Sequence, residues 1–345
     1  MIVIWASCGH NPEIHDLNLQ KYLKKKGFRI FDFTPYNKPK HKIFYNVAIG
    51  CLKYLFKYLS FSEIKFILSS QNVSLIRKVF YLSQLGMIRS VSNKNPSNIN
   101  IIFRGNNIPL IECLHRYKNI KTMIIPHGLY FSDPPENNFF YYANSILTGT
   151  KTWPNKDYQG KKIYSGMIEN INLTKSKKKP GVPLDLSLCV THGRTGEANE
   201  INRILKILNN HKFQTNIRFH PRNLELKNYI KNEKVYRHEL QKLEIAEYIK
   251  LFDIFLFTVG YNNRVSNVIY EAALCDKPVL IASDKDIKIV NIPCNLNKYI
   301  IKIQNLSRKE SFLEKGNLLK DQLLQSIYQS DSIYNDIYLN LKGED

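Results

Sequence analysis

The sequence predicts an α/β protein of two domains, each built on a parallel sheet, and three observations support this. The chain has 345 residues, which is more than one hydrophobic core usually organises. Short apolar, β-branched runs alternate with segments of helical length along most of it, and that alternation is typical of parallel sheets covered by helices on both faces. A stretch rich in Lys, Pro and Gly interrupts the alternation near the middle, as a linker does.

The first domain is expected over residues 1–167. It opens with an apolar run at 1–6, a helical pattern at 16–26 and a second apolar run at 28–33, which together indicate a β-α-β unit. Further strands are expected at 64–68, 99–103, 121–125 and 145–147, with helices at 74–85 and 108–117.

The predicted linker is 168–183, and the second domain follows over 184–306. Its expected strands are 184–191, 215–219, 254–258 and 278–282, and its expected helices are 197–209, 224–232, 243–252 and 266–275. The tail, 307–345, has a helical pattern, and whether it returns to the first domain stays open.

Composition and charge limit the function classes. Hydrophobic residues make up 43% and charged residues 23%, as in an ordinary globular protein. The net charge of +21, from 50 Lys and Arg against 29 Asp and Glu, favours anionic partners such as phosphorylated substrates, an anionic membrane face or nucleic acid. The chain lacks an aromatic RNA-binding motif, a helix-turn-helix and a zinc finger, so we expect no nucleic-acid substrate.

The cellular context is expected to be the cytoplasm. The N-terminus lacks the basic and apolar regions of a secretion signal, and no apolar stretch reaches 18 residues. The six cysteines include no C-x-x-C pair, so buried free thiols are expected. Residues 40–61 mix aromatic residues with Lys, and two interpretations stay open: a helix on an anionic membrane, and a helix packed on the sheet.

The most specific local motif is RFHPRN, residues 218–223, directly after a predicted strand. It places Arg218, His220 and Pro221 at the carboxyl edge of a parallel sheet, where α/β proteins bind their ligands. Cationic and hydrogen-bonding side chains there suit a nucleotide phosphate or base. A structural role for His220 is the alternative.

A second motif, residues 258–282, begins at the end of another strand. Ser266 and Asn267 are expected to open a helix and to meet a phosphate there, because helix N-termini carry free N–H groups. Glu271, one turn later, is expected to reach the ribose hydroxyls. The alternative is a structural helix that Ser266 caps.

A third and weaker motif, THGRTGE at 191–197, also ends a strand. His192, Gly193 and Arg194 become donor-binding candidates because the glycine allows the backbone to approach a phosphate. The spacing matches neither of the common glycine-rich phosphate loops, and a plain turn is an equal alternative.

In the first domain, IIPHGLY places His127 after a strand, where a histidine can bind a donor phosphate or stabilise a leaving group. The first βα turn carries His10, Glu13, His15 and Asp16. Any of them is a candidate general base for an acceptor hydroxyl, and we single out Glu13 and His15. Helix capping or simple solvation is the alternative for each. No metal site and no cofactor are expected, because the only D-x-D sequence, 284–286, is too short to be specific.

Taken together, the motifs P-H-G, R-x-H-P and S-N-x-x-x-E-A followed by K-P-V-L resemble those of metal-independent GT-B glycosyltransferases of bacterial surface polysaccharides, in particular transferases of sialic acid, Kdo and related acidic sugars. The resemblance implies the GT-B fold, with two Rossmann-like domains facing a central cleft. It implies a CMP-linked donor held by His220 and Pro221 at the nucleotide and by Ser266 and Asn267 at the phosphate.

The function expected from this resemblance is transfer of an acidic sugar from a CMP-linked donor to a glycan or lipid-linked glycan acceptor of a capsule, lipooligosaccharide or O-antigen. The basic surface would then favour peripheral contact with an anionic membrane. A CDP-glycerol-type glycerophosphotransferase and a UDP-sugar GT-B transferase are the enzyme alternatives. UDP-sugar 2-epimerases share the fold, but their arginine and glycine signatures are absent. A basic nucleic-acid or membrane-binding protein is the non-enzyme alternative.

Overall fold

The structure is a computed structural model of the whole chain. It describes residues 1–7, 14–33, 57–70, 75–95, 98–104, 109–126, 129–131, 139–154, 157–170, 173, 185–191, 198–211, 213–231, 233–260, 263–284, 288–289, 291–307 and 311–344. At 7, 14, 15, 76, 77, 139, 169, 221, 222, 233, 307 and 311 it describes the backbone alone.

The N-terminal unit contains a six-stranded parallel sheet in the order β2-β1-β3-β4-β5-β6. Its strands are β1 (Ile2–Ser7), β2 (Arg29–Asp32), β3 (Ile99–Arg104), β4 (Ile120–Ile125), β5 (Ser145–Thr148) and β6 (Lys161–Tyr164). Its helices are α1 (Ile14–Lys25), α3 (Phe61–Ser69), α4 (Leu75–Lys94) and α5 (Pro109–His115), with 3-10 turns at Phe139–Tyr142 and Ile168–Asn170.

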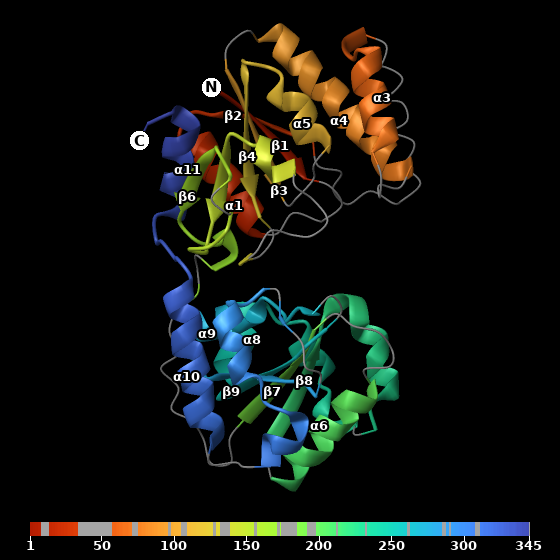
Figure 1. Cartoon of the computed structure of the whole chain (residues 1–345), viewed down its shortest axis with the longest axis vertical. Coiled ribbons are helices and arrows are strands. Elements are labelled where there is room, and N and C mark those ends of the chain that lie inside the picture. The colour runs from red at the N-terminus through yellow and green to blue at the C-terminus, as the bar shows by residue number, and fades with distance from the viewer. Residues whose placement is uncertain are drawn as a thin grey trace.

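Helices cover both faces of this sheet, as the apolar composition of its strands requires. Along β1, Ile2 and Ile4 contribute to the core under α4 and α5, whereas Val3 and Trp5 contribute to the core under α1. This alternation follows from the two-residue period of a strand. Figure 1 shows α3, α4 and α5 on one side of the sheet and α1 on the other.

The C-terminal unit contains a four-stranded parallel sheet in the order β10-β9-β7-β8. Its strands are β7 (Asp185–Val190), β8 (Gln214–Phe219), β9 (Ile254–Thr258) and β10 (Val279–Ala282). Its helices are α6 (Ala198–Asn210), α7 (His238–Gln241), α8 (Ile245–Leu251) and α9 (Val268–Leu274), with 3-10 turns at Pro221–Tyr229, Glu233–Val235, Cys294–Tyr299 and Ile303–Ser307.

The central strands of this second sheet are also buried on both faces. Phe255 and Phe257 of β9 belong to one core cluster, and Ile254 and Leu256 belong to the cluster on the opposite face. The prediction of two parallel sheets covered by helices is therefore confirmed.

The tail connects the two units, a possibility that the sequence left open. Helix α10 (Ser311–Ser326) packs beside α9 and β10 of the C-terminal unit, and α11 (Ile333–Lys342) packs on the N-terminal sheet beside α1 (Figure 1). Between the two helices, the Tyr328 N–H donates to the Gly149 carbonyl at 2.8 Å and the Ser330 N–H donates to the Ser165 carbonyl at 2.7 Å. The chain thus crosses from one unit to the other twice.

The expected strand at 64–68 is wrong, because these residues belong to helix α3. A capping box starts the helix: the Glu63 N–H donates to Ser60 Oγ at 3.3 Å, and the Ser60 N–H donates to Glu63 Oε2 at 2.7 Å. The hydroxyl of Tyr117 donates to Glu63 Oε1 at 2.5 Å. Burial raises the pKa of Glu63, but the hydrogen bonds from Tyr117 and Ser60 outweigh it and hold the pKa below its ordinary value.

Two further differences concern short elements. The sequence did not indicate strand β6, and the helix expected at 224–232 is a 3-10 segment, Pro221–Tyr229, interrupted at Asn223. The linker expected at 168–183 falls between the two sheets, and most of it lies outside the described residues, as does most of 40–61.

Among the described helices, none is both long and apolar enough to cross a membrane. Of the cysteines in the described residues, Cys113, Cys189 and Cys275 are buried and free, as expected, whereas Cys294 is exposed.

Candidate functional site

The carboxyl edge of the four-stranded sheet is held together by a pair of threonines. Thr191 follows β7 and Thr258 ends the neighbouring strand β9, and both are buried. The Thr191 N–H donates to Thr258 Oγ1 at 3.2 Å, and the Thr191 hydroxyl donates to the Thr258 carbonyl at 2.8 Å. The two strand ends are therefore fixed to each other beyond the last ladder hydrogen bond.

Thr191 also fixes the segments that follow the neighbouring strands. Its hydroxyl oxygen accepts a hydrogen bond from the Ser266 N–H at 3.0 Å, and its carbonyl accepts one from Asn223 Nδ2 at 3.1 Å. Asn223 is buried, and its N–H donates to the His220 carbonyl at 2.8 Å. The segments that follow β7, β8 and β9 thus meet at one residue, through the hydroxyl and the backbone carbonyl of Thr191.

The segment between β9 and α9 is held from its other side by Asn291. The Asn291 amide accepts from the Val265 N–H at 3.0 Å and donates to the Val265 carbonyl at 2.8 Å. Its Nδ2 lies 3.4 Å from Asn267 Oδ1. The hydroxyl of Tyr270 donates to the Asn291 carbonyl at 2.8 Å. Because both sides of the segment are bonded, Ser266 and Asn267 stand on a fixed backbone.

Helix α9 begins later than expected. It starts at Val268, not at Ser266, and Asn267 has helical dihedral angles and makes no side-chain capping bond. Ser266 Oγ accepts only a long hydrogen bond, 3.4 Å, from the Val268 N–H. The helix has seven residues, so any ligand contacts here depend on the side chains of Ser266, Asn267 and Glu271 more than on a helix dipole.

Arg218 lies in β8, and its guanidinium contacts α7 and the segment that follows it. It donates to the carbonyls of Leu240 at 3.2 Å and Leu243 at 3.0 Å, and its carbon Cζ lies 4.3 Å from the centre of the Tyr248 ring. These contacts hold the turn between α7 and α8 against the sheet. These contacts give Arg218 a structural role, and its expected contact with the donor phosphate stays a prediction.

His220 and the residues of α9 come to the same edge of the sheet. His220 is half-buried directly after β8, and its N–H donates to the Val190 carbonyl at 3.0 Å. Ser266, Asn267 and Glu271 are each half-buried on the neighbouring segment. The structure thus brings together four of the expected donor-binding residues.

For seven of the expected site residues, the structure does not describe the position of the side chain. Glu13, His127, His192, Gly193 and Arg194 lie outside the described residues, and only the backbone of His15 and Pro221 is described. Their roles in catalysis and donor binding stay predictions.

At the carboxyl edge of the N-terminal sheet, a buried ion pair joins three strand ends. Arg104, at the end of β3, places Nε 2.8 Å from Asp16 Oδ1, and its Nη1 donates to the Pro126 carbonyl at 2.7 Å. Asp16 belongs to the helix after β1, and Pro126 follows β4. The sequence offered Asp16 as a general base, but its buried pairing with Arg104 gives it a structural role.

The carboxyl edges of the two sheets face each other. The Phe131 ring, just after β4, stacks on Tyr270 of α9 with ring centres 6.0 Å apart. Arg264 lies over the Tyr130 ring at 5.9 Å, and Leu129 belongs to the core cluster of the C-terminal unit. The chain segment next to the P-H-G motif is therefore in contact with the helix that carries Glu271.

The Cys189 thiol and the Tyr270 hydroxyl, near this edge, stay protonated at neutral pH. Burial raises the pKa of Cys189 to about 12 and raises the pKa of Tyr270 well above its ordinary value. Neither group is thus available as a nucleophile or base under ordinary conditions.

Among the residues that the structure describes, no group of three or more His, Cys, Asp or Glu side chains has the arrangement of a metal site. Sequence reasoning missed three residues of the edge, Thr191, Asn223 and Asn291. Thr191 and Asn223 lie in the THGRTGE and RFHPRN motifs, but their contacts with distant segments, like those of Asn291, leave no signal in the local sequence.

No protein-family model matches the chain, and no curated protein matches it either. Solved structures do. S. aureus MnaA in a co-structure with UDP has a TM-score of 0.58 and 13% identity, over 99% of this chain and 96% of that one. A putative UDP-N-acetylglucosamine 2-epimerase from Listeria monocytogenes has a TM-score of 0.57 and 12% identity, over 100% and 97%.

The spinosyn rhamnosyltransferase SpnG complexed with thymidine diphosphate has a TM-score of 0.50 and 11% identity, over 98% of this chain and 100% of that one. At such low sequence identities, the similarity supports a shared fold alone. The expected fold is confirmed: the chain has a GT-B architecture, with two Rossmann-like units whose sheet edges face each other.

The role of Thr191 can be tested with Thr191→Val, which keeps the shape of the side chain and removes its hydroxyl. The variant loses the bonds to the Thr258 carbonyl and the Ser266 N–H, so we expect Tm to fall by on the order of 5 °C in calorimetry.

Thr215→Val on β8 is the matched control, because the Thr215 hydroxyl makes no hydrogen bond in the structure. Its Tm should stay within about 1 °C of the parent. Equal Tm values for the two variants would show that Thr191 does not hold the edge together.

Proposed function

We propose that this protein is a glycosyltransferase that binds a nucleotide-activated sugar at the carboxyl edge of its four-stranded sheet. The observation that supports this most is the convergence of His220, Ser266, Asn267 and Glu271 at an edge that Thr191 fixes. Ligands of open α/β sheets bind at this edge. The GT-B architecture places a second sheet edge opposite, where an acceptor can meet the donor.

Each side chain has a role that its chemistry suits. Ser266 and Asn267 donate hydrogen bonds to phosphate oxygens, and His220 binds the phosphate or the base. The Glu271 carboxylate accepts hydrogen bonds from the ribose hydroxyls. These donors sit on a backbone already fixed by Thr191 and Asn291, so little reorganisation is needed when the leaving phosphate gains charge.

The proposed reaction is a displacement at the anomeric carbon. The acceptor hydroxyl oxygen forms the new bond to that carbon, the bond from the carbon to the phosphate oxygen breaks, and the nucleotide leaves with the bonding electrons. The hydroxyl proton passes to a general base. Glu13, His15 and His127 are the candidates for the base and for stabilising the leaving group. Electrostatic stabilisation by the protein, without a metal, is part of the proposal.

The sequence motifs and the similar structures favour different nucleotides for the donor. The sequence motifs resemble those of CMP-sugar transferases, whereas the structurally similar proteins carry UDP or thymidine diphosphate. We propose a nucleotide sugar as the donor class, with a UDP-type donor and a CMP-linked acidic sugar as its two candidates. The proposed acceptor is a bacterial surface glycan or its lipid-linked precursor.

An epimerase is the second candidate function, because a putative UDP-N-acetylglucosamine 2-epimerase is among the similar structures. The two reactions differ in one requirement. An epimerase isomerises its nucleotide sugar without an acceptor, whereas a transferase releases the nucleotide at an appreciable rate only when an acceptor is present. Proton NMR of the nucleotide sugar, with and without acceptor, separates them.

The donor site can be tested by thermal shift with CMP, CDP, UMP, UDP, GDP and thymidine diphosphate, each with and without EDTA. We expect one nucleotide to raise Tm selectively and EDTA to leave the shift unchanged, because binding to the folded state alone stabilises it. His220→Ala and Glu271→Gln should each weaken binding about tenfold.

His211→Ala and Glu247→Gln are matched controls: His211 follows α6, just ahead of the amino end of β8, and Glu247 is exposed on α8. Both should bind nucleotide like the parent. Unchanged binding by His220→Ala and Glu271→Gln would place the nucleotide elsewhere, and a lack of any shift would favour a non-enzymatic basic binding protein.

Peripheral contact with an anionic membrane is a further part of the proposal, supported by the surface of α3 and the start of α4. Phe61 and Leu75 are 81% and 71% exposed, and Leu68 is 43% exposed. Lys65 lies on the same face of α3 as Phe61 and Leu68, four and three residues away. Exposed aromatic and aliphatic side chains beside lysines suit an interface of anionic lipids.

This contact predicts binding to vesicles that contain an anionic phospholipid. The double variant Phe61→Ser with Leu75→Ser should lower vesicle binding at least about tenfold in a sedimentation assay, because two large apolar side chains no longer enter the interface. Leu318→Ser is the control, since Leu318 is 46% exposed on α10 of the other unit. Equal binding by both variants would exclude α3 as the contact.

A further inference from the structure

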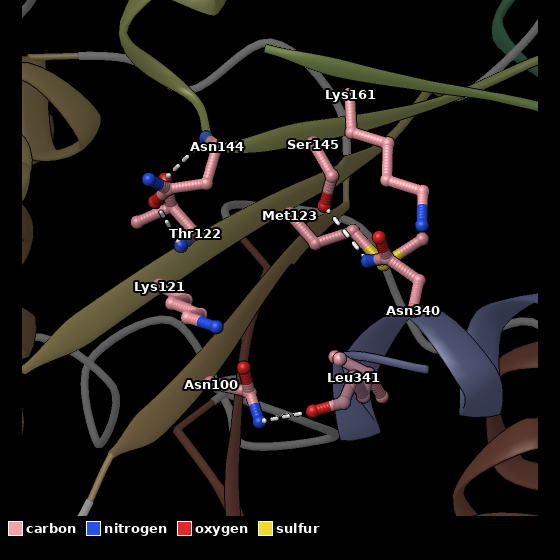
Figure 2. A pocket seen from close by; sticks show the side chains of 10 residues that line it. Asn100, Lys121, Thr122, Met123, Asn144, Ser145, Lys161, Asn340 and Leu341 are labelled. Atoms are coloured by element: carbon pink, nitrogen blue, oxygen red, sulfur yellow. Dashed lines mark hydrogen bonds between the residues drawn. The ribbon is translucent and has the colours of Figure 1, made fainter. Parts of the chain in front are cut away.

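A pocket lies at the amino edge of the N-terminal sheet, on the side of the sheet away from the proposed donor site. Its volume is about 220 Å³. Residues at or just ahead of the starts of β3, β4, β5 and β6 form one wall, and the last turn of α11 forms the other. Figure 2 shows the two walls, with Asn340 and Leu341 of α11 facing the strands.

The chemistry of the lining is cationic and polar. Lys121 and Lys161 stand on different strands, and none of the ten lining residues is an Asp or a Glu. Both lysines are exposed. In Figure 2, Lys161 extends from β6 toward Asn340, and Lys121 lies across the pocket near Asn100. Two ammonium groups approaching one space from separate strands favour an anion there.

The polar groups at the base of the pocket are already oriented. Asn340 Nδ2 donates to Ser145 Oγ at 3.0 Å, so the Ser145 hydroxyl keeps its own proton to donate. Asn100 Nδ2 donates to the Leu341 carbonyl at 3.1 Å, and Asn100 is buried. The strands and α11 thus share hydrogen bonds around the pocket.

The end of a helix normally presents carbonyl oxygens, which repel an anion. Here the carbonyls of the last turn are occupied. Those of Leu339 and Asn340 accept from the Gly343 N–H at 3.0 and 3.1 Å, and that of Leu341 accepts from Asn100. Gly343 has φ of 80°, which lets the chain close this cap. These hydrogen bonds reduce the partial negative charge that the helix end presents, and Glu344, which follows Gly343, is paired with Lys342 at 2.8 Å.

We propose that this pocket is a binding site for a phosphate group, held by Lys121 and Lys161 with a hydrogen bond from the Ser145 hydroxyl, which Asn340 orients. The bound anion joins β4 and β6 to α11, and α11 is the helix by which the tail from the C-terminal unit returns to the N-terminal sheet. Binding therefore stabilises the docking of the tail. The proposal does not depend on the proposed glycosyltransferase function, because the two sites lie on different sheets. The phosphate pocket is at the amino edge of the six-stranded sheet, and the proposed donor site is at the carboxyl edge of the four-stranded sheet.

Isothermal titration with inorganic phosphate, at constant ionic strength kept with chloride, tests the site on the full-length protein. We expect saturable binding at one site per chain. Lys121→Gln and Lys161→Gln should each raise Kd about tenfold, because each removes one charge-assisted hydrogen bond. Hydrogen exchange should slow in residues 333–342 when phosphate binds.

Lys206→Gln on α6 is the charge-matched control, since it makes the same change on the other unit, and it should leave Kd unchanged. His220→Ala separates this site from the donor edge and should also leave it unchanged. Glycerol 3-phosphate is the second probe: tighter binding than inorganic phosphate identifies a phosphate ester as the ligand class, and equal binding identifies the free anion.

Three results would overturn the proposal. The first is the absence of saturable phosphate binding. The second is an unchanged Kd in the double variant Lys121→Gln with Lys161→Gln. The third is loss of phosphate binding in His220→Ala. The last result would show that phosphate occupies the donor edge instead.

Discussion

The hydroxyl of Thr191 is the interaction on which the proposed site depends. It donates to the Thr258 carbonyl and accepts from the Ser266 N–H, while the carbonyl of the same residue accepts from Asn223. Parallel strands carry their connecting segments away from the sheet, and nothing in the ladder itself fixes how those segments are placed. One buried threonine at the centre of the edge fixes three of them. His220, Ser266 and Glu271 can then stand close to one another before any ligand arrives, which is the preorganisation that electrostatic catalysis requires.

The two units are connected at two places with different consequences. Near the sheet edges, Phe131 stacks on Tyr270 and Arg264 lies over Tyr130. On the far side of the N-terminal sheet, α11 packs with α1. The first connection joins the segment beside the P-H-G motif to the helix that carries Glu271, so the two sheet edges are in direct contact there. The second connection holds the units in one molecule and also closes the phosphate pocket.

Much of the fold could be predicted from the sequence, because strand and helix periodicities are local. The strands of both sheets, apart from β6, appear as apolar runs, and their alternation with helices gives the parallel order. The strand expected at 64–68 was wrong although its helix signal was present: Ser60 and Glu63 form the S-x-x-E box. The contacts of Arg218 with the Leu240 and Leu243 carbonyls could not be predicted, because these partners lie 22 and 25 residues further along the chain. The structural roles of Thr191 and Asn291 could not be predicted, since their partners lie 75 and 26 residues away in the chain.

Hydrogen exchange with and without the nucleotide that gives the largest thermal shift tests the central claim most directly. The account predicts slower exchange at Thr191, in 220–223 and in 263–271, because these residues form the edge that Thr191 organises. It also predicts that Thr191→Val reduces this protection at Thr191 and in 263–271, which its hydroxyl holds, more than in 220–223, which its backbone carbonyl holds. Protection confined to the N-terminal sheet, or protection of 263–271 that Thr191→Val leaves intact, would contradict it.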